Sequence, residues 1–536
     1  MNTVTNDDTD ALIKKYKQVR KKQIERLKDT DDINEGFEPQ DIDFIERPWG
    51  DEPIDSVLNH IDNNSELLKQ YSEAFSLKTP SWLDVWFAIK KEKGNEQLLT
   101  KYRVDQSKLS HMFLQINKLV SYPNLLLGAI YQKEKGSWRL FKNNEVITYV
   151  ESELTKIFDG WDVYDNQTVV LTRKYIIRLM YQGKDSKDPF MKSSPYLVAF
   201  KNGTFNMKTG ALEENSPENY ILDGHDYELD TSNAETPQTD SWFKELFGEN
   251  AEFMTQYVGY LFYRSYDYSQ IILILQSEGG RGKSKWLNYI KNLVGFGNHS
   301  SMSLKQLTSD SEFNSSALYQ KDLNYFADIG SDFIRSTETI KALSGDDTTA
   351  AQFKGSNSFD FHNHAKLLFS ANKLPTTKVD DTGLRRRIKI VPIVSPVVDN
   401  AFKQRHPMKK INQERSAFVY KAIKAFMWAM KNIDGKNFGA TRSILNATNK
   451  WIDDNDTVKN WLIESVEDGN VWAGGFTRGI EAYKSYNDWS LGNGYKSKGR
   501  NLLFKELQRL GLIQDRRTFN GKQQRCWILP EQYLDK

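Results

Sequence analysis

The residues best suited to chemistry lie in a glycine-rich segment near the middle of the chain. The apolar run Ile271–Leu275 leads into Gln276-Ser-Glu-Gly-Gly-Arg-Gly-Lys-Ser284, after which apolar residues recur at helical spacing as far as Ile290. A strand, a glycine-rich turn and a helix beginning at Lys-Ser can cradle a triphosphate, because backbone N–H groups approach the phosphates and the helix N-terminus is partly positive. We therefore predict an ATP site made by seven residues: Gly279, Gly280, Arg281, Gly282, Lys283, Ser284 and Lys285.

Two residues of this loop have predicted roles in catalysis. We expect the ammonium of Lys283 to contact the β- and γ-phosphates and the hydroxyl of Ser284 to hold Mg²⁺. Ser277 stands where the first glycine of such loops usually lies, but three glycines remain inside the loop. The alternative is a glycine-rich turn without a ligand, which would not explain the strand pattern before it and the helical pattern after it.

Polar residues that end two later apolar runs could complete the site. The run Leu323-Asn-Tyr-Phe-Ala-Asp328 ends in a carboxylate, which we expect to hold Mg²⁺ beside the phosphate loop. The run Lys366-Leu-Leu-Phe-Ser-Ala-Asn372 ends in an amide that can orient water against the γ-phosphate. The group that activates this water stays open between Asp328 alone, Asp332 and an acid from elsewhere. Ordinary strand-ending polar residues are the alternative interpretation.

Three consecutive arginines precede another apolar run. They end the segment Asp380-Asp-Thr-Gly-Leu-Arg-Arg-Arg387, directly before Ile388–Ile393. In ring-shaped ATPases an arginine of one subunit completes the site of its neighbour by stabilising charge in the transition state. Arg386 and Arg387 are our candidates for this role, and Arg385 is a weaker one. The alternative is that these arginines pair with carboxylates of their own subunit.

The elements that position these residues follow from the periodicity of the chain. Between residues 242 and 430 apolar strands alternate with helices, which predicts an α/β core with a mostly parallel sheet. The four expected strands are Ile271–Leu275, Leu323–Ala327, Ala365–Ser370 and Ile388–Ile393. We expect a multidomain chain with a mostly helical region at 1–115, a small α+β domain at 116–235, the core at 236–435 and a DNA-binding domain at 440–536.

Composition limits the classes of protein that remain. The chain has 536 residues, of which 39% are hydrophobic and 27% charged, and its single cysteine excludes a disulfide framework or a cysteine-rich zinc site. No apolar run is long enough for a membrane helix, so we expect a cytoplasmic protein without a membrane partner. The net charge is only +2, but basic residues cluster between Lys14 and Lys28, within a predicted amphipathic helix over 11–28.

The C-terminal tail has the pattern of a winged helix. Two predicted helices, Phe476–Tyr486 and Lys498–Leu510, precede a hairpin that turns at Asn520-Gly521. A basic second helix followed by a basic wing is a geometry that docks on DNA, although winged helices also bind proteins. The predicted DNA contacts are Arg500, Lys505, Arg516, Arg517 and Lys522.

The order of these motifs resembles that of superfamily 3 helicases of the phage, plasmid and poxvirus primase–helicase type. The likeness is greatest to the replication initiator (Rep) helicases of staphylococcal pathogenicity islands. It covers about residues 242–394, and Val198–Gly210 is similar to the domain that commonly precedes this core. The resemblance implies a phosphate-loop core of the AAA+ type that uses ATP and Mg²⁺. It further implies a homo-hexameric ring with DNA in its channel.

The same family carries a β-hairpin that projects into the ring channel. The matching stretch here is Ser344–Phe361, in which Lys354-Gly355 could form the tip. By this resemblance Lys354 contacts a DNA phosphate, and Phe353 or Phe359 packs beneath it. A lysine that is merely solvated at the tip is the alternative.

These observations together predict an ATP-dependent replicative DNA helicase that initiates replication of a mobile genetic element. Its ring would move along DNA and unwind the duplex, with host replication proteins as further partners. One alternative is an origin-binding initiator whose ATP site gates assembly with little unwinding, since Ala327 and Ile329 leave Asp328 without an adjacent second acid. Another is a different phosphate-loop enzyme, such as a packaging motor or a kinase.

Overall fold

The structure is a computed structural model, and it divides the chain into two compact units. The first comprises Met1–Pro123, Leu127–Ile130 and Phe141–Asp185, and the second comprises the rest. The predicted basic helix at 11–28 and Asp332 lie outside the described residues. Those residues are 66–67, 80–92, 95–122, 127–141, 145–181, 189–309, 312–329, 337–345, 347–355, 358–375, 382–495 and 497–533.

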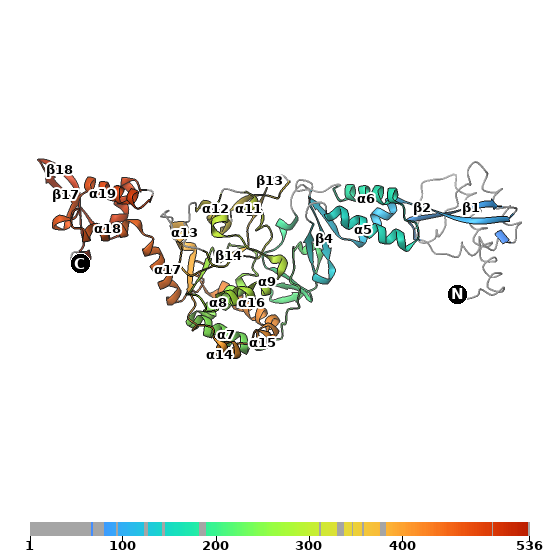
Figure 1. The fold of residues 1–536 in the computed structure, drawn as a ribbon, viewed down its shortest axis with the longest axis horizontal. Helices are drawn as coiled ribbons and strands as arrows, with labels where there is room; N and C mark the ends of the chain where they lie inside the picture. The colour runs from blue at the N-terminus through green and yellow to red at the C-terminus, as the bar shows by residue number, and fades with distance from the viewer. Residues whose placement is uncertain are drawn as a thin grey trace. The chain divides into compact units, whose positions relative to one another are not determined.

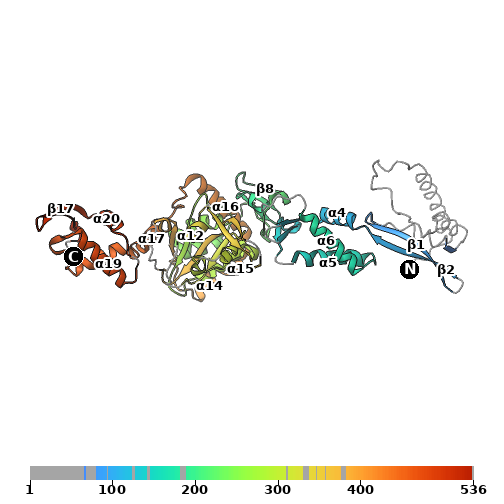
Figure 2. The ribbon, with the colours of Figure 1, turned by 90° about the horizontal axis from the view of Figure 1, so that it is seen from above.

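The first unit contains a long hairpin and a helical core. Strands β1 (Leu83–Glu92) and β2 (Asn95–Val104) pair antiparallel along their whole length (Figure 2). The expectation of a mostly helical region is therefore wrong for residues 83–104, because this pairing joins residues that local spacing does not relate. Helices α4 (Gln106–Ile116), α5 (Glu145–Gly160) and α6 (Asn166–Tyr181) bury apolar residues in one cluster.

Two small sheets are also present, one between α4 and α5 in the chain and one after α6. Strands β3 (Leu119–Tyr122), β4 (Leu127–Gln132) and β5 (Ser137–Leu140) form the first sheet. Strands β6 (Leu197–Phe200), β7 (Gly203–Asn206) and β8 (Ala211–Glu213) form an antiparallel meander.

The second unit begins earlier than the predicted core. Residues 186–235 belong to it, whereas we expected the 116–235 segment to form one domain. The physical reason is burial, because Val198, Phe200 and Phe205 of the meander lie in the same apolar cluster as the core helices.

The core of the second unit is a parallel sheet of five strands. They are β9 (Ile272–Gln276), β10 (His299–Ser300), β11 (Leu323–Phe326), β14 (Lys366–Ala371) and β15 (Ile388–Pro392). Their order across the sheet is β10-β11-β14-β9-β15, with every pairing parallel. The four predicted strands are confirmed within one residue at every end, whereas β10 was not predicted. The sheet order places β14 between β9 and β11, which brings their carboxyl ends to one edge.

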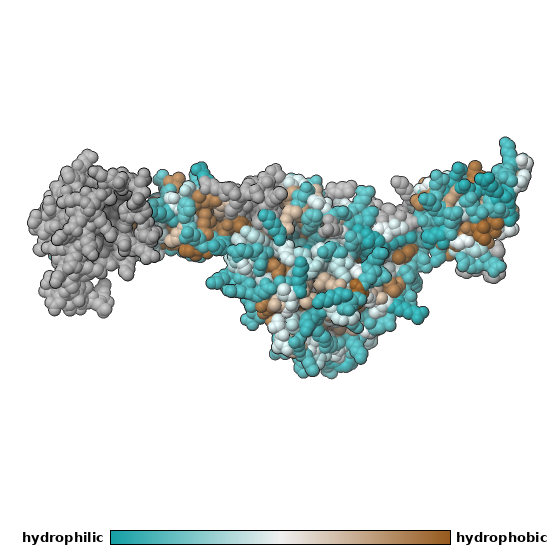
Figure 3. All heavy atoms as spheres, turned by 180° about the vertical axis from the view of Figure 1, so that it is seen from behind, coloured by the Kyte–Doolittle hydropathy of each residue, from teal (hydrophilic) through white to brown (hydrophobic). Residues whose placement is uncertain are grey.

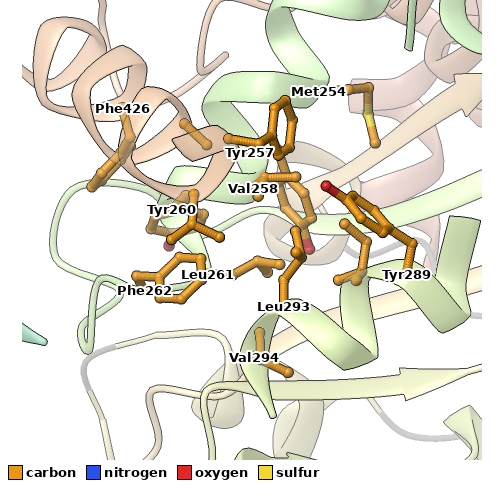
Figure 4. Packing of buried hydrophobic residues seen from close by; sticks show 14 of the residues in the cluster. Met254, Tyr257, Val258, Tyr260, Leu261, Phe262, Tyr289, Leu293, Val294 and Phe426 are labelled. Carbon is orange, nitrogen blue, oxygen red and sulfur yellow. The ribbon is translucent and has the colours of Figure 1, made fainter. Parts of the chain in front are cut away.

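Helices cover the sheet and supply most of the core (Figure 1). In Figure 4, residues of α8 (Ala251–Tyr260) and the segment after it pack with α9 (Lys283–Val294) and with Phe426 of α16 (Arg415–Asn432). The aromatic side chains Tyr257, Tyr260 and Tyr289 are almost completely buried there. The other helices of this part are α7 (Pro237–Phe247), α10 (Leu304–Leu307), α11 (Glu312–Ser316), α12 (Glu338–Leu343), α13 (Thr382–Arg387), α14 (Asn400–Arg405) and α15 (Met408–Gln413).

A two-stranded hairpin is inserted between β11 and β14. Strands β12 (Thr348–Gln352) and β13 (Ser358–His362) pair antiparallel, so the hairpin predicted within Ser344–Phe361 is confirmed.

The tail combines helices with a small antiparallel sheet. It contains α17 (Arg442–Asp454), α18 (Thr457–Glu467), α19 (Gly479–Gly492) and α20 (Arg500–Arg509), followed by β17 (Ile513–Phe519) and β18 (Lys522–Ile528). The predicted turn is confirmed: Asn520 and Gly521 have φ of 49° and 75°, as a tight type I′ turn requires. A third strand, β16 (Phe476–Arg478), pairs with β18 and was expected to be the start of a helix.

None of the described helices has the length and apolar character needed to cross a bilayer. Hydrophilic side chains cover most of the described surface in Figure 3, and the apolar patches on this face are small.

Candidate functional site

The predicted phosphate loop lies between β9 and α9, in the strand–turn–helix order expected from the sequence. Gly280 and Gly282 have φ of 80° and 94°, in the left-handed region that side chains disfavour. Gly282 is the N-cap of α9 and offers no side chain to its first turn. The first N–H groups of a helix have no partner within the helix, so this end of α9 is suited to an anion.

Lys283 is hydrogen-bonded to residues that directly follow two strands, Ser277 after β9 and Asn372 after β14. Its ammonium donates to the carbonyl of Ser277, to the hydroxyl of Ser277 at 3.0 Å and to Oδ1 of Asn372 at 2.6 Å. Partial burial lowers the pKa of Lys283, and the charge of Asp328 acts in the opposite direction. Ser277, which replaces the usual glycine, thus supplies a hydroxyl that contacts the lysine.

Asn372 links the lysine to the predicted metal-side acid. Its Nδ2 donates to Oδ1 of Asp328 at 3.0 Å, while its Oδ1 accepts from Lys283. The contact follows from the sheet order, because Asn372 leaves β14 between the ends of β9 and β11. Three residues predicted from separate motifs therefore meet at one edge of the sheet.

The backbone at Asp328 departs from regular strand geometry. This non-glycine residue has a φ of 57°, and its N–H donates to Oγ of Ser370 at 3.1 Å. Such strained positions persist where the surroundings hold them, and they cluster at functional sites. The strand has ended before this position, and the carboxylate of Asp328 is exposed.

Arg281 links the loop to the segment after β15, a contact that its position in the sequence did not indicate. Its guanidinium donates to the carbonyl of Ser395 at 2.8 Å and pairs with Glu278 at 3.2 Å. The hydroxyl of Ser395 donates back to the carbonyl of Arg281 at 2.8 Å. The other loop residues, Ser284 and Lys285, are exposed on the first turn of α9.

The three arginines of α13 differ in exposure. Arg386 is exposed, and its guanidinium donates to Oε1 of Gln270 at 2.6 Å. Arg387 is buried, with 7% of its surface exposed, and donates to the carbonyl of Gly383. Burial also lowers the pKa of Arg385. The burial of Arg387 argues against its presentation to a neighbouring subunit, because the side chain is already enclosed within its own subunit.

The inserted hairpin carries an exposed lysine above an aromatic cluster. Lys354 is exposed at the turn, beside Gly355 with a φ of 82°. Phe353 stacks on Phe359 with ring centroids 5.0 Å apart, and Tyr319 meets both rings edge-on at 5.7 and 5.2 Å. Phe353 and Phe359 therefore pack against each other and against Tyr319, next to the turn that carries Lys354.

The basic residues of the tail fall into two groups. Four predicted contacts are exposed on α20 and on the hairpin: Arg500, Lys505, Arg516 and Lys522. Arg517 differs, because its guanidinium lies 4.3 Å from the ring centroid of Phe476 and pairs with Asp515 at 3.3 Å. Part of its charge is thus used inside the domain.

Comparisons with known proteins find two family models and one viral protein that are similar to parts of the chain. A family described as "D5 N terminal like" matches residues 161–248, and a family of unknown function (DUF5906) matches residues 275–387. Over 234 residues the chain is 26% identical to a protein of Acanthamoeba polyphaga mimivirus named as a putative helicase. That match covers 41% of this chain and 23% of the viral protein, so the chain spans about a quarter of its relative.

Solved structures of low similarity include two apo forms of the C-terminal region of NrS-1. Their sequence identities are 12% and 13%, with TM-scores of 0.45 and 0.43. The matches cover 79% and 80% of this chain and 98% and 99% of the solved chains. TM-scores below 0.5 at this identity support no assignment of function.

Proposed function

We propose that this chain is an ATP-dependent DNA helicase that initiates replication of a mobile genetic element. The observation that carries the proposal is the contact of Lys283, Asn372 and Asp328 beside a phosphate loop. A lysine for the phosphates, a carboxylate for Mg²⁺ and an amide for water are the groups that phosphoryl transfer to water needs. The similarity of part of the chain to a viral protein named as a putative helicase supports the choice of a DNA motor over a kinase.

The residues present fit Mg²⁺ and ATP. Asp328 and the hydroxyl of Ser284 offer oxygen ligands of the kind that Mg²⁺ prefers, and both side chains are exposed at the loop. The bound metal would neutralise charge that develops on the phosphates. Lys283 would bind and orient the β- and γ-phosphates, and Asn372, whose amide lies between the lysine and Asp328, would orient water against the γ-phosphate.

We further propose a homo-hexameric ring of the AAA+, superfamily 3 type. Exposed Arg386 would reach the site of the neighbouring subunit, and the hairpin with Lys354 would line the channel and grip a DNA phosphate. The tail, folded as a winged helix, would dock on duplex DNA through its exposed cations, and host replication proteins would assist loading.

ATP hydrolysis by mixed variants tests the proposed site and its sharing between subunits. Lys283→Ala and Arg386→Ala should each abolish DNA-stimulated hydrolysis, and mixing them should restore part of it. Restoration follows because some interfaces then pair an intact loop with an intact arginine. Full activity of either variant alone, or no restoration on mixing two assembled variants, would count against a site shared in this way.

A second candidate is an origin-binding initiator whose ATP site gates assembly. One observation favours it. Asn372 contacts the carboxylate of Asp328, and the residues on either side of Asp328, Ala327 and Ile329, are not acids. A site with one acid could bind ATP and hydrolyse it slowly. This candidate predicts DNA binding that survives Lys283→Ala, together with little strand separation by the wild-type protein.

A further inference from the structure

The segment that follows β15 runs along the phosphate loop. Main-chain hydrogen bonds join Ile393 to Gln276 at 2.9 Å and Val398 to Gly280 at 2.8 Å. Between these two bonds, Ser395 and Arg281 are linked to each other by two further hydrogen bonds of 2.8 Å. The position of this segment against the loop is therefore fixed by its backbone.

Two valines of this segment are exposed. Val394 has 52% of its surface exposed and Val397 has 62%, whereas Val391 and Ile393 just before them are buried. We call these two side chains the valine shelf. A methyl of Val397 would lie 3.5 Å from a Cβ at Gly280, and a methyl of Val394 would lie 3.1 Å from a Cβ at Gly248. Val397 therefore lies beside the phosphate loop. Val394 lies beside the end of α7, where its N–H donates to the carbonyl of Leu246 at 2.9 Å, and a methyl of Leu246 would lie 3.1 Å from a Cβ at Gly282 of the loop.

The sheet order shows which end of a triphosphate would face the shelf. The groups that act on the reacting γ-phosphate, Asn372 and Asp328, follow β14 and β11, on one side of β9. The valine shelf follows β15, on the opposite side of β9. A triphosphate bound along the loop with its γ-phosphate at Asn372 therefore directs its other end, which carries the nucleoside, toward the shelf.

We propose that the valine shelf is the subsite that packs against the base of the bound nucleotide. The inference rests on the proposed ATP site and adds the group that holds the nucleoside. A nucleobase has flat apolar faces, and covering them removes apolar surface of both partners from water. Three polar side chains of the loop and the segment are bound to one another, since Arg281 and Ser395 bind each other and Glu278 pairs with Arg281. The base is therefore held by apolar contact with the two valines.

Binding of two probes by the full-length protein tests the proposal. The first probe is Mg-ATP and the second is inorganic tripolyphosphate, which has the phosphates but no base. The test variant is the double substitution Val394→Asn and Val397→Asn, which removes apolar surface without adding a charge that would repel phosphates. The control is Val394→Ile with Val397→Ile, which keeps the shelf apolar.

We expect the asparagine variant to lose affinity for the nucleotide and to keep its affinity for tripolyphosphate. The asparagine variant should bind Mg-ATP about tenfold more weakly, the loss expected for roughly one apolar side-chain contact. The isoleucine control should match the wild type, and all three proteins should bind tripolyphosphate alike at equal melting temperatures. Unchanged ATP binding by the asparagine variant would overturn the proposal, and so would an equal loss for both probes. Failure of the wild type to bind either probe would instead remove the proposed ATP site itself.

Discussion

At the scale of single residues, the site depends on a chain of contacts from Lys283 through Asn372 to Asp328. Residue type and position at the ends of apolar runs were enough to predict these three side chains. The sequence did not reveal the difference between Arg386 and Arg387, because adjacent residues of a short helix face different surroundings only after packing. The same holds for Arg281, whose partner Ser395 lies 114 residues further along the chain.

Substitution of Asn372 separates binding from hydrolysis. In Asn372→Ala the amide that lies between the lysine and the acid is lost, while the loop keeps its glycines and Lys283. We expect kcat for ATP hydrolysis to fall about a hundredfold, as on removal of one positioned donor at a reacting centre, with KM changed much less. Steady-state kinetics with Mg-ATP provides the measurement. Asn449→Ala, at an exposed asparagine of α17, is the matched control and should behave as wild type.

Substitution of Arg386 and of Arg387, at the end of α13, should have different effects on activity and stability. Arg386→Ala should abolish hydrolysis with an unchanged melting temperature, because its side chain is exposed. Arg387→Ala should cost about 1–3 kcal/mol of stability, because it removes a buried group and its hydrogen bond to Gly383. Thermal denaturation and hydrolysis assays on both variants distinguish the roles. A stable but inactive Arg387→Ala protein together with an active Arg386→Ala protein would reverse the assignment.

At the scale of elements, the parallel sheet makes the site and the inserted hairpin provides the proposed DNA contact. Four strands were predictable because each is a continuous apolar run, as expected for strands buried on both faces. Strands β10 and β16 were missed because two or three residues carry no period. The β1–β2 hairpin was missed because pairing between strands, rather than local spacing, defines it.

Removal of the lysine at the hairpin tip should weaken the contact with DNA and leave the ATP site intact. Lys354→Ala should lower the affinity for single-stranded DNA and reduce the slope of log K against log salt by about one, as expected for one lost phosphate contact. Hydrolysis without DNA should stay at the wild-type rate. Titration of a labelled single strand at several salt concentrations measures the slope. Lys436→Ala, at another exposed lysine, should leave the slope unchanged, and equal slopes for wild type and Lys354→Ala would remove Lys354 from the interface.

A buried histidine near the sheet should make stability depend on pH. Burial, with a contribution from the charge of Arg264, lowers the pKa of His225 from 6.5 to about 3. Its Nδ1 lies 3.0 Å from the carbonyl of Val294. Between these two pKa values the unfolded chain binds a proton that the folded protein does not, so stability falls as the pH is lowered from 6.5 toward 3.

The loss attributable to His225 is about 1.4 kcal/mol per pH unit within that window. His225→Gln cannot take up this proton, so its free energy of unfolding should fall less steeply between pH 6 and pH 4.5. Urea denaturation at a series of pH values measures both slopes. Parallel slopes for wild type and variant would contradict the neutral, buried state of His225.

At the scale of the whole molecule, the chain divides into an N-terminal unit and a second unit that contains both the parallel sheet and the basic tail. The predicted boundary at residue 235 missed the start of the core unit at 186 because burial of the β6–β8 meander with the core helices is a long-range contact. The helices and hairpin of the tail were largely predictable, since a turn such as Asn520-Gly521 acts locally.

Separation of a forked DNA duplex by the purified full-length protein is the most direct test of the central claim, that this chain is an ATP-driven helicase. The wild type should separate the strands only with ATP and Mg²⁺, and Lys283→Ala should bind the fork without separating it. If the wild type binds the fork and ATP but leaves the duplex intact, the helicase is contradicted, and the initiator with an ATP-gated assembly takes its place.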